Sequence, residues 1–325
     1  MSYKNKSLWL ATAALVLVVH ALAAPLAYGQ AATFSRLLGT VRDQTGAVVP
    51  GVEVTATATA TNIPHMAVTN DRGDYVVDKL IPGFYDISAE LPGFKTARSL
   101  GVRLEVQTVS RVDLTMEPGD ISEQVTVTGQ STIIDTDNAE VAAVIEEKKI
   151  LDLPLAGRDM VKLAYLTTGG TQERQEIGYS TLYAYGGGYP TFNGMYSHSN
   201  QIQLDGSNNM GYITQRPTVQ PTPETVQEFK VITNNYSAEY GRVGGAVITM
   251  LSKSGSNEFH GHAWYYFRDE RMDAANFFTN RTGSGKLPVN YQIFGGSVGG
   301  PIFKDRTFST PTTSGSSTTS RSSAS

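Results

Sequence analysis

Residues able to carry acid–base or metal chemistry are few and scattered in this sequence. Five histidines and no cysteine are present, so thiolate metal sites, disulfides and cysteine nucleophiles are excluded together. His260 and His262 lie two residues apart, a spacing that puts both imidazoles on one face of a strand and suits a metal pair. Because no third ligand is identifiable, a polar pair without metal is the preferred interpretation. The sequence predicts no enzyme, cofactor or metal, since no nucleophile, base and orienting group come together.

Three glycines, Gly241, Gly244 and Gly245, stand just before an apolar run and are the next candidates for chemistry. Closely spaced glycines can cradle a phosphate, but no Lys-Ser or Lys-Thr follows in the register that a phosphate loop needs. We therefore expect them to permit positive φ and close backbone packing beside the strand from residue 246 to residue 251.

Composition limits the classes of protein that this chain can belong to. With 325 residues, of which 40% are hydrophobic and 17% charged, the chain can bury the cores of about two domains. The net charge of −4 offers no basic excess for a phosphate backbone, so nucleic acid is not an expected partner.

The N-terminus predicts export. Lys4 and Lys6 precede an apolar run over residues 8–19, and small residues follow, which together form the three regions of a signal peptide spanning residues 1–30. The alternative is a single-pass anchor, but the run is shorter than the roughly 20 residues that a spanning helix needs. No later apolar stretch is long enough for a membrane-spanning helix, so any membrane insertion would have to use strands.

Residues 37–118 show the alternation of β-strands. Val52, Val54 and Ala56 alternate with polar residues, and turn-forming pairs such as Pro50-Gly51 separate short strands of this kind, which predicts a small β-sandwich. The run "GTVRDQTGAVVPGVEVTATATATN" followed by "TNDRGDYVVDKLIPGFYDISAELPGFK" resembles the carboxypeptidase regulatory-like domain. The resemblance implies an Ig-like accessory sandwich and no peptidase. Related sandwiches bind carbohydrate, although no paired aromatic platform is evident here.

A linker over residues 119–132 contains "ISEQVTVTGQ", an extended segment with no second half to form a hairpin. Such a segment can complete the sheet of another protein through main-chain hydrogen bonds. It resembles the TonB box of TonB-dependent receptors, which implies that the partner is TonB. The implied contact residues are Glu123, Val125, Val127 and Thr128. The alternatives are a last strand of the sandwich or a plain tether.

Residues 133–254 mix helix and strand signals, with helices expected over 141–151 and 159–166 and strands over 226–232 and 246–251. The segments "LDLPLAGRDMVKLAYLTTGG", "NQIQLDGSNN" and "TVQEFKVITNNYSAEYGRVGGAVITMLSKSGSN" resemble the α+β plug domain of the same receptors, although Thr168 replaces an expected proline. The signature positions are Pro154, Gly157, Arg158, Asp205, Gly206, Gly241, Gly244 and Gly245. Asp205 and Gly206 predict a tight turn.

Aromatic residues gather in a Tyr/Gly-rich stretch over residues 178–198. Tyr183, Tyr185 and Tyr189 are candidate ligand contacts at a plug apex, because such rings combine apolar area with a polar tip. The preferred interpretation is a flexible or partner-packed loop.

From residue 255 to residue 308 the chain resembles the first transmembrane β-barrel strands of the Oar-like branch of TonB-dependent receptors, on the runs "NEFHGHAWYYFRDERMDAANFF" and "YQIFGGSVGGPIFKDRTF". Residues 309–325 are almost all Ser and Thr, a composition that predicts a disordered tail. The barrel is then incomplete, with about two to four strands. A shifted reading frame or a premature stop is the economical explanation.

These features predict a multidomain chain: sandwich, plug and the first strands of a barrel. The implied function is the N-terminal portion of a TonB-dependent receptor that takes up an unknown ligand, carbohydrate or peptide, and that does not transport in this truncated form. The family implies the outer membrane, while the truncated chain alone is expected to be periplasmic. A periplasmic or surface binding module without a barrel, with carbohydrate as one ligand, is the alternative.

Overall fold

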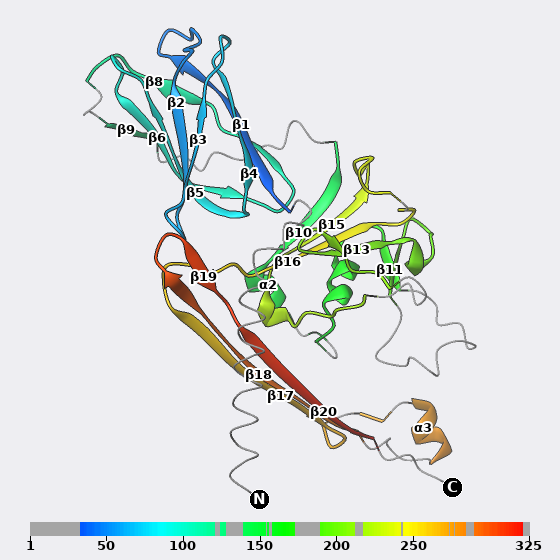
Figure 1. Cartoon of the computed structure of the whole chain (residues 1–325). Helices are drawn as coiled ribbons and strands as arrows, with labels where there is room; N and C mark the ends of the chain where they lie inside the picture. The colour runs from blue at the N-terminus through cyan, green and yellow to red at the C-terminus, as the bar shows by residue number, and fades with distance from the viewer. Residues whose placement is uncertain are drawn as a thin grey trace, which may run out of the picture.

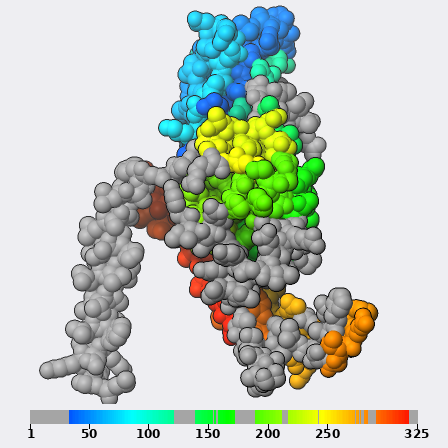
Figure 2. Space-filling view, turned by 90° about the vertical axis from the view of Figure 1, so that its right-hand side faces the viewer, coloured from blue at the N-terminus to red at the C-terminus, as the bar shows by residue number. Residues whose placement is uncertain are grey.

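The computed structural model describes residues 33–120, 124–127, 139–153, 155, 158–172, 189–211, 217–241, 243–272, 274–275, 277–283 and 289–320. The described residues form three parts: a β-sandwich, a central unit of strands and short helices beside it, and a long C-terminal sheet that begins next to the sandwich and extends away from it (Figures 1 and 2). The predicted signal peptide lies outside the described residues. Within these ranges, no helix is long and apolar enough to cross a membrane.

The N-terminal part, residues 33–120 with 124–127, is a two-sheet sandwich. One sheet joins β1 (Ser35–Asp43) to β4 (Asp74–Leu80), β7 (Val109–Arg111) and β8 (Leu114–Met116). The other has the order β3 (Pro64–Val68), β2 (Glu53–Ala58), β5 (Gly83–Glu90), β6 (Thr96–Leu104) and β9 (Gln124–Val127). The predicted alternation is confirmed, because Val52, Val54 and Ala56 are all fully buried in the core between the sheets.

One close approach inside the sandwich explains why Gly39 is a glycine. A Cβ at this position would collide with the carbonyl oxygen of Val112 and would lie 2.8 Å from Cε1 of Tyr75. The hydroxyl of Tyr75 donates a 2.7 Å hydrogen bond to the same carbonyl. Burial raises the pKa of the Tyr75 hydroxyl well above its ordinary value. The neutral hydroxyl therefore ties β4, across Gly39 of β1, to Val112, the residue after β7.

The central unit, residues 139–253, is built on a five-stranded sheet. The strand order is β10 (Val141–Glu146), β15 (Val226–Asn234), β16 (Val247–Ser252), β13 (Gln201–Leu204) and β14 (Ser207–Asn208). The flanking elements are α2 (Glu147–Asp152), the 3₁₀ helices Met160–Leu166, Ser197–Ser199 and Pro223–Thr225, and the pair β11 (Gly170–Gln172) and β12 (Pro190–Phe192). Phe229 and Val231 of β15 are fully buried in its core.

The helix predicted over residues 141–151 is wrong in its first half. Residues 141–146 form β10, which pairs antiparallel with β15, and helix begins only at Glu147. Val144 and Ile145 are β-branched, and strand pairing overrides their weak helical periodicity. The second predicted helix is a 3₁₀ helix whose N-cap, Asp159, accepts a 3.1 Å hydrogen bond from the amide of Val161. Burial raises the pKa of Asp159.

The C-terminal sheet consists of β17 (His260–Asp269), β18 (Val289–Phe303), β19 (Thr307–Ser309) and β20 (Thr312–Ser320), with the short helix α3 (Phe277–Thr282) between β17 and β18. The long strand β18 pairs antiparallel with the other three. The prediction of a disordered tail is wrong up to residue 320, because β20 pairs with β18 over nine residues. Main-chain hydrogen bonds need no apolar side chains, and threonine favours strands.

Candidate functional site

The candidate docking segment is partly described. Glu123 and Thr128 lie outside the described residues, whereas Val125 and Val127 belong to β9. This strand is not isolated as expected: it pairs parallel with β6, with Val125 opposite Ala97 and Val127 opposite Ser99. β9 is thus the last strand of the sandwich, which was the alternative interpretation of this segment. A role in docking stays a prediction.

Arg158 is the signature residue with the most defined surroundings; Pro154 and Gly157 lie outside the described residues. Its guanidinium forms an ion pair and hydrogen bond with Glu224, and these side chains are only 11% and 6% exposed. The ring of Tyr266, from β17, lies 4.3 Å from the guanidinium carbon, and its hydroxyl donates a 3.3 Å hydrogen bond to Glu224. The arrangement joins the central unit to the C-terminal sheet through a charged pair covered by an aromatic ring.

Sequence reasoning missed Glu224 and Tyr266. Glu224 stands 66 residues from Arg158, in the 3₁₀ turn that leads into β15, and no local pattern links the two. The available signal was chemical. An arginine expected to be buried requires a carboxylate, and Glu224 is an acidic residue two positions before the buried strand β15.

The predicted Asp205-Gly206 turn is confirmed. Both residues have positive φ, 50° and 75°, and they connect β13 to β14. The carboxylate of Asp205 also accepts hydrogen bonds from the amide (2.8 Å) and the hydroxyl (2.9 Å) of Ser252. The turn therefore fixes the end of β16 as well as reversing the chain.

Two of the three signature glycines serve close packing. None of the three has positive φ, so that part of the prediction is wrong. A Cβ on Gly244 would lie 3.0 Å from the Met195 side chain, and one on Gly245 would collide with the amide group of Asn200, whereas Gly241 meets nothing within 4 Å. Close packing is therefore confirmed for two of the three. The amides of Gly244 and Gly245 donate to the Ser199 carbonyl at 3.0 and 3.1 Å, so they are not aimed at a phosphate.

The aromatic candidates are only partly described, because Tyr183 and Tyr185 lie outside the described residues. Tyr189 packs half-buried against the central core, and its hydroxyl accepts a 3.3 Å hydrogen bond from Gln220. This placement fits the interpretation of a packed loop residue. Contact with a ligand stays a prediction.

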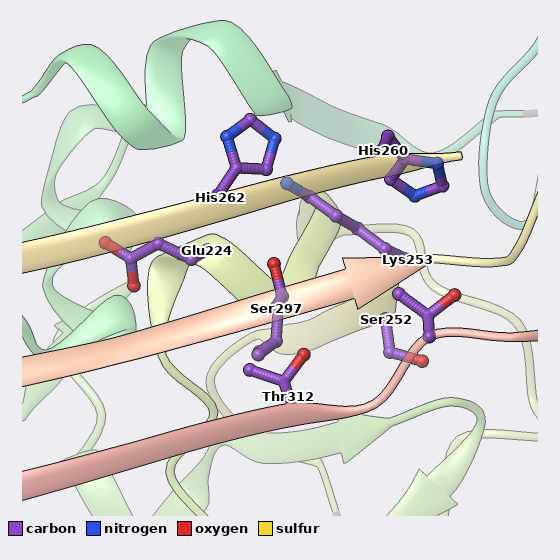
Figure 3. Close-up of a pocket in the computed structure, with 9 residues that line it drawn as sticks. Glu224, Ser252, Lys253, His260, His262, Ser297 and Thr312 are labelled. Atoms are coloured by element: carbon purple, nitrogen blue, oxygen red, sulfur yellow. The ribbon is translucent and has the colours of Figure 1, made fainter. Parts of the chain in front are cut away.

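His260 and His262 line a cavity of about 220 Å³ between the central unit and the C-terminal sheet (Figure 3). Lys253 lies on its wall and is paired with Glu147 at 2.6 Å. Nδ1 of His260 lies 3.0 Å from the Glu258 carbonyl. In the part of the chain that the structure describes, no three His, Cys, Asp or Glu side chains are grouped to hold a metal. Most of the residues that line the cavity are serines, threonines and the two histidines.

Comparison with known families and proteins gives two domain matches and one relative. Residues 36–117 match the carboxypeptidase regulatory-like domain family, and residues 251–324 match the outer membrane beta barrel domain family. The TonB-dependent transporter Oar of Myxococcus xanthus is 29% identical over 306 residues. These residues are 87% of this chain but only 27% of that transporter, so the chain spans about a quarter of the relative's length.

Two solved structures are similar at low score. The siderophore receptor PirA of Acinetobacter baumannii is 18% identical, with a TM-score of 0.41 over 55% of this chain and 24% of that one. PirA of Pseudomonas aeruginosa is 17% identical, with a TM-score of 0.35 over 56% of this chain and 29% of that one. We draw no structural or ligand conclusion from scores this low.

Together, the domain matches and the long alignment agree with the order of parts in the structure. Sandwich, central unit and C-terminal sheet follow one another as the sequence predicted. The chain thus carries a carboxypeptidase regulatory-like domain and a match to an outer membrane β-barrel domain, and over most of its length it is a homologue of a TonB-dependent transporter.

Proposed function

We propose that the chain is the N-terminal portion of a TonB-dependent outer-membrane receptor, in which the central unit is the plug and the C-terminal sheet is the start of the barrel wall. The observation that carries the proposal is the two-sided character of β17 and β18. Tyr265 and Phe267 on β17 and Phe294 on β18 are 59%, 56% and 51% exposed. At the alternate positions Trp264 and Ile293 are 9% and 8% exposed, while Tyr266 on the same face is 40% exposed.

This alternation is what a barrel strand beside a plug requires. Residues that alternate along a strand point to opposite faces, so Tyr265 and Phe294, which are opposite each other in the ladder, share the exposed face. Tyr266 points the other way and covers the Arg158–Glu224 pair of the central unit. Exposed aromatic rings on the outer face suit the membrane interface, and a polar inner contact suits a plugged lumen.

For the partner, we propose that residues 121–130 dock on the C-terminal domain of TonB by strand addition. The support is the homology to a TonB-dependent transporter and the strand conformation of β9. β9 has one strand partner among the described residues, β6, so its other edge is the one that a further strand would join.

The docking proposal is tested by titrating purified chain with the TonB C-terminal domain. Val125→Pro removes an amide donor and is expected to abolish binding. Val125→Thr is the matched control, because threonine keeps the amide and the β-branched shape, and its affinity should equal that of the parent. Equal binding by the proline variant would show that residues 121–130 are not the docking segment.

We further propose that this chain alone does not transport, and the ligand of the complete receptor is left open. In the structure described, β17 and β20 each have β18 as strand partner and offer a second edge. Lipid cannot pair these edges, so a stable barrel needs further strands. Carbonate-resistant fractionation with the outer membrane, together with heat-modifiable migration in mild detergent, would contradict this proposal. The match to a barrel domain family disfavours the alternative of a binding module without a barrel.

A further inference from the structure

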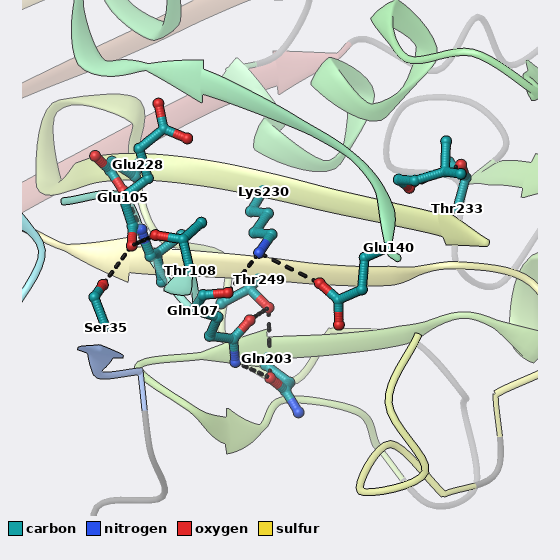
Figure 4. A network of polar contacts seen from close by, with 12 residues as sticks. Ser35, Glu105, Gln107, Thr108, Glu140, Gln203, Glu228, Lys230, Thr233 and Thr249 are labelled. Carbon is teal, nitrogen blue, oxygen red and sulfur yellow. Dashed lines mark hydrogen bonds and ion pairs between the residues drawn. The ribbon is translucent and has the colours of Figure 1, made fainter. Parts of the chain in front are cut away.

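One turn of the sandwich, Glu105–Thr108, which we call the joint turn, bonds to the central unit (Figure 4), and Gln227 of β15 also donates a 3.3 Å hydrogen bond to the Pro82 carbonyl of the sandwich. The main chain of the joint turn makes two contacts with β15. The amide of Val106 donates to Oε2 of Glu228 at 2.8 Å, and the carbonyl of Gln107 accepts from Nζ of Lys230 at 2.8 Å. Because these two contacts use main-chain atoms, they depend on where the turn lies and not on which side chains it carries.

Side chains extend the same contact to two more strands. The side-chain oxygen of Gln107 accepts a 3.1 Å hydrogen bond from Thr249 of β16, and its amide nitrogen lies 3.4 Å from the Gln203 oxygen of β13. Arg103, at the end of β6, pairs with Glu146 of β10 at 2.6 Å and with Glu228 at 3.3 Å. The joint turn and Arg103 therefore contact four neighbouring strands of the central sheet.

The central unit needs these contacts because the charged side chains that make them are buried. Glu228 is 3% exposed and Lys230 is 1% exposed. Lys230 forms an ion pair with Glu140 at 3.6 Å, and its Nζ also donates to the Gln107 carbonyl of the sandwich. Buried charges without compensating groups are strongly unfavourable, so the sandwich supplies polar partners that this face of the sheet needs.

The joint also closes a loop in the chain. The docking segment, residues 121–130, contains β9, which pairs with β6 of the sandwich, and the central unit begins with β10, which pairs with β15. The docking segment is therefore linked to β15 in two ways, through the β10 ladder that follows it in sequence and through the sandwich and the joint turn.

We propose that the sandwich is a fixed, force-transmitting partner of the central unit: the joint turn and Arg103 help to hold both domains as one body, and a pull on residues 121–130 reaches β15 from both sides. The proposal rests on the proposed docking function for the origin of the pull. The fastening itself does not depend on it, and each is tested separately.

The fastening is tested with the full chain by pulsed electron paramagnetic resonance between spin labels at Met66→Cys and Leu166→Cys. These positions are 65% and 62% exposed, lie on the two domains, and are the only cysteines, because the chain has none of its own. The joint variant is Arg103→Ala/Gln107→Gly, in which glycine suits the φ of 52° at residue 107.

The matched control is Arg72→Ala/Gln44→Gly, the same change of composition at sandwich positions that are exposed. We expect one narrow distance in the parent and the control, and a distribution roughly twofold or more wider in the joint variant, since loosely joined domains move relative to one another. A broad distribution in the parent, or equal widths in parent and joint variant, would overturn the fastening. Arg103→Ala alone serves if the double variant does not fold, because it removes the ion pairs with Glu146 and Glu228.

Load sharing is tested by pulling single molecules between handles at Val125→Cys and Ser254→Cys. The first rupture force should be lower in the joint variant than in the parent, and equal forces would overturn load sharing. TonB binding, measured by titration, should be the same for joint variant and parent. If the parent itself does not bind TonB, the docking function is refuted, and the fastening result still stands.

Discussion

The Arg158–Glu224 pair gives the sharpest energetic prediction. Both side chains are nearly buried, at 11% and 6% exposed, and Tyr266 covers the guanidinium at 4.3 Å. Arg158→Met leaves the Glu224 charge buried without its partner, which typically destabilises by about 3–5 kcal/mol. Loss of the cation–π contact adds about 0.5–1 kcal/mol, because Tyr266 is partly exposed.

A double-mutant cycle separates the pair from simple truncation. Glu224→Gln removes the charge that Arg158→Met would leave unpaired, so the double variant should be no less stable than Arg158→Met alone. The interaction free energy from the cycle is expected to be about 1–3 kcal/mol. Arg111→Met is the control: Arg111 and Asp113 are 42% and 55% exposed, and loss of such a surface pair changes stability by about 1 kcal/mol or less.

Urea unfolding followed by tryptophan fluorescence measures these differences in the free energy of unfolding close to the Arg158–Glu224 pair. The chain has two tryptophans, Trp9 in the predicted signal peptide and Trp264 on β17. A chain starting near residue 30 therefore reports through Trp264, two residues from Tyr266. Additive losses in the double variant, or a loss in Arg158→Met no larger than that in Arg111→Met, would refute the reasoning.

Three further changes test other parts of the structure. Gly39→Ala should lower the thermal unfolding midpoint of the sandwich, with a loss of about 1–3 kcal/mol or more from overpacking, whereas Gly241→Ala, which meets nothing within 4 Å, should stay within about 0.5 kcal/mol of the parent. Tyr75→Phe leaves the buried Val112 carbonyl without its 2.7 Å donor, and chemical denaturation should show a loss of about 1–3 kcal/mol. Burial raises the pKa of Glu228, so the folded state holds its proton more tightly than the unfolded state does. As the pH falls from neutral through that raised pKa, the free energy of unfolding of the parent should therefore rise relative to Glu228→Gln, by at most about 1.4 kcal/mol per pH unit; a constant difference across this range would refute the shift.

The sandwich was predictable because its signals are local. Alternation of Val52, Val54 and Ala56 decides which face is buried within one strand, and the Asp205-Gly206 turn is likewise specified by two adjacent residues. β10 was missed because its conformation depends on β15, whose residues lie more than 80 positions away. β20 was missed because main-chain pairing leaves no mark in side-chain composition.

The contacts of the candidate site were predictable only as residue types. Arg158 could be singled out from its segment, but its partner Glu224 is distant in sequence. The joint was beyond sequence reasoning for a different reason. Lys230 and Glu228 are bonded there to the carbonyl of Gln107 and the amide of Val106, and backbone atoms are the same at every position. Only the folded arrangement shows which amide or carbonyl a buried charge meets.

The chemistry of the joint has a consequence for how the two domains can come apart. The contacts described for Arg103, the Val106 amide and Gln107 are hydrogen bonds and ion pairs, and the fully buried Val106 is the one large apolar side chain of the joint turn. Water can replace each of these partners when the joint opens, whereas separated apolar surfaces would adhere to other proteins. If the joint is forced open, it is therefore expected to close again, which lets the two domains act as one body over repeated cycles of load.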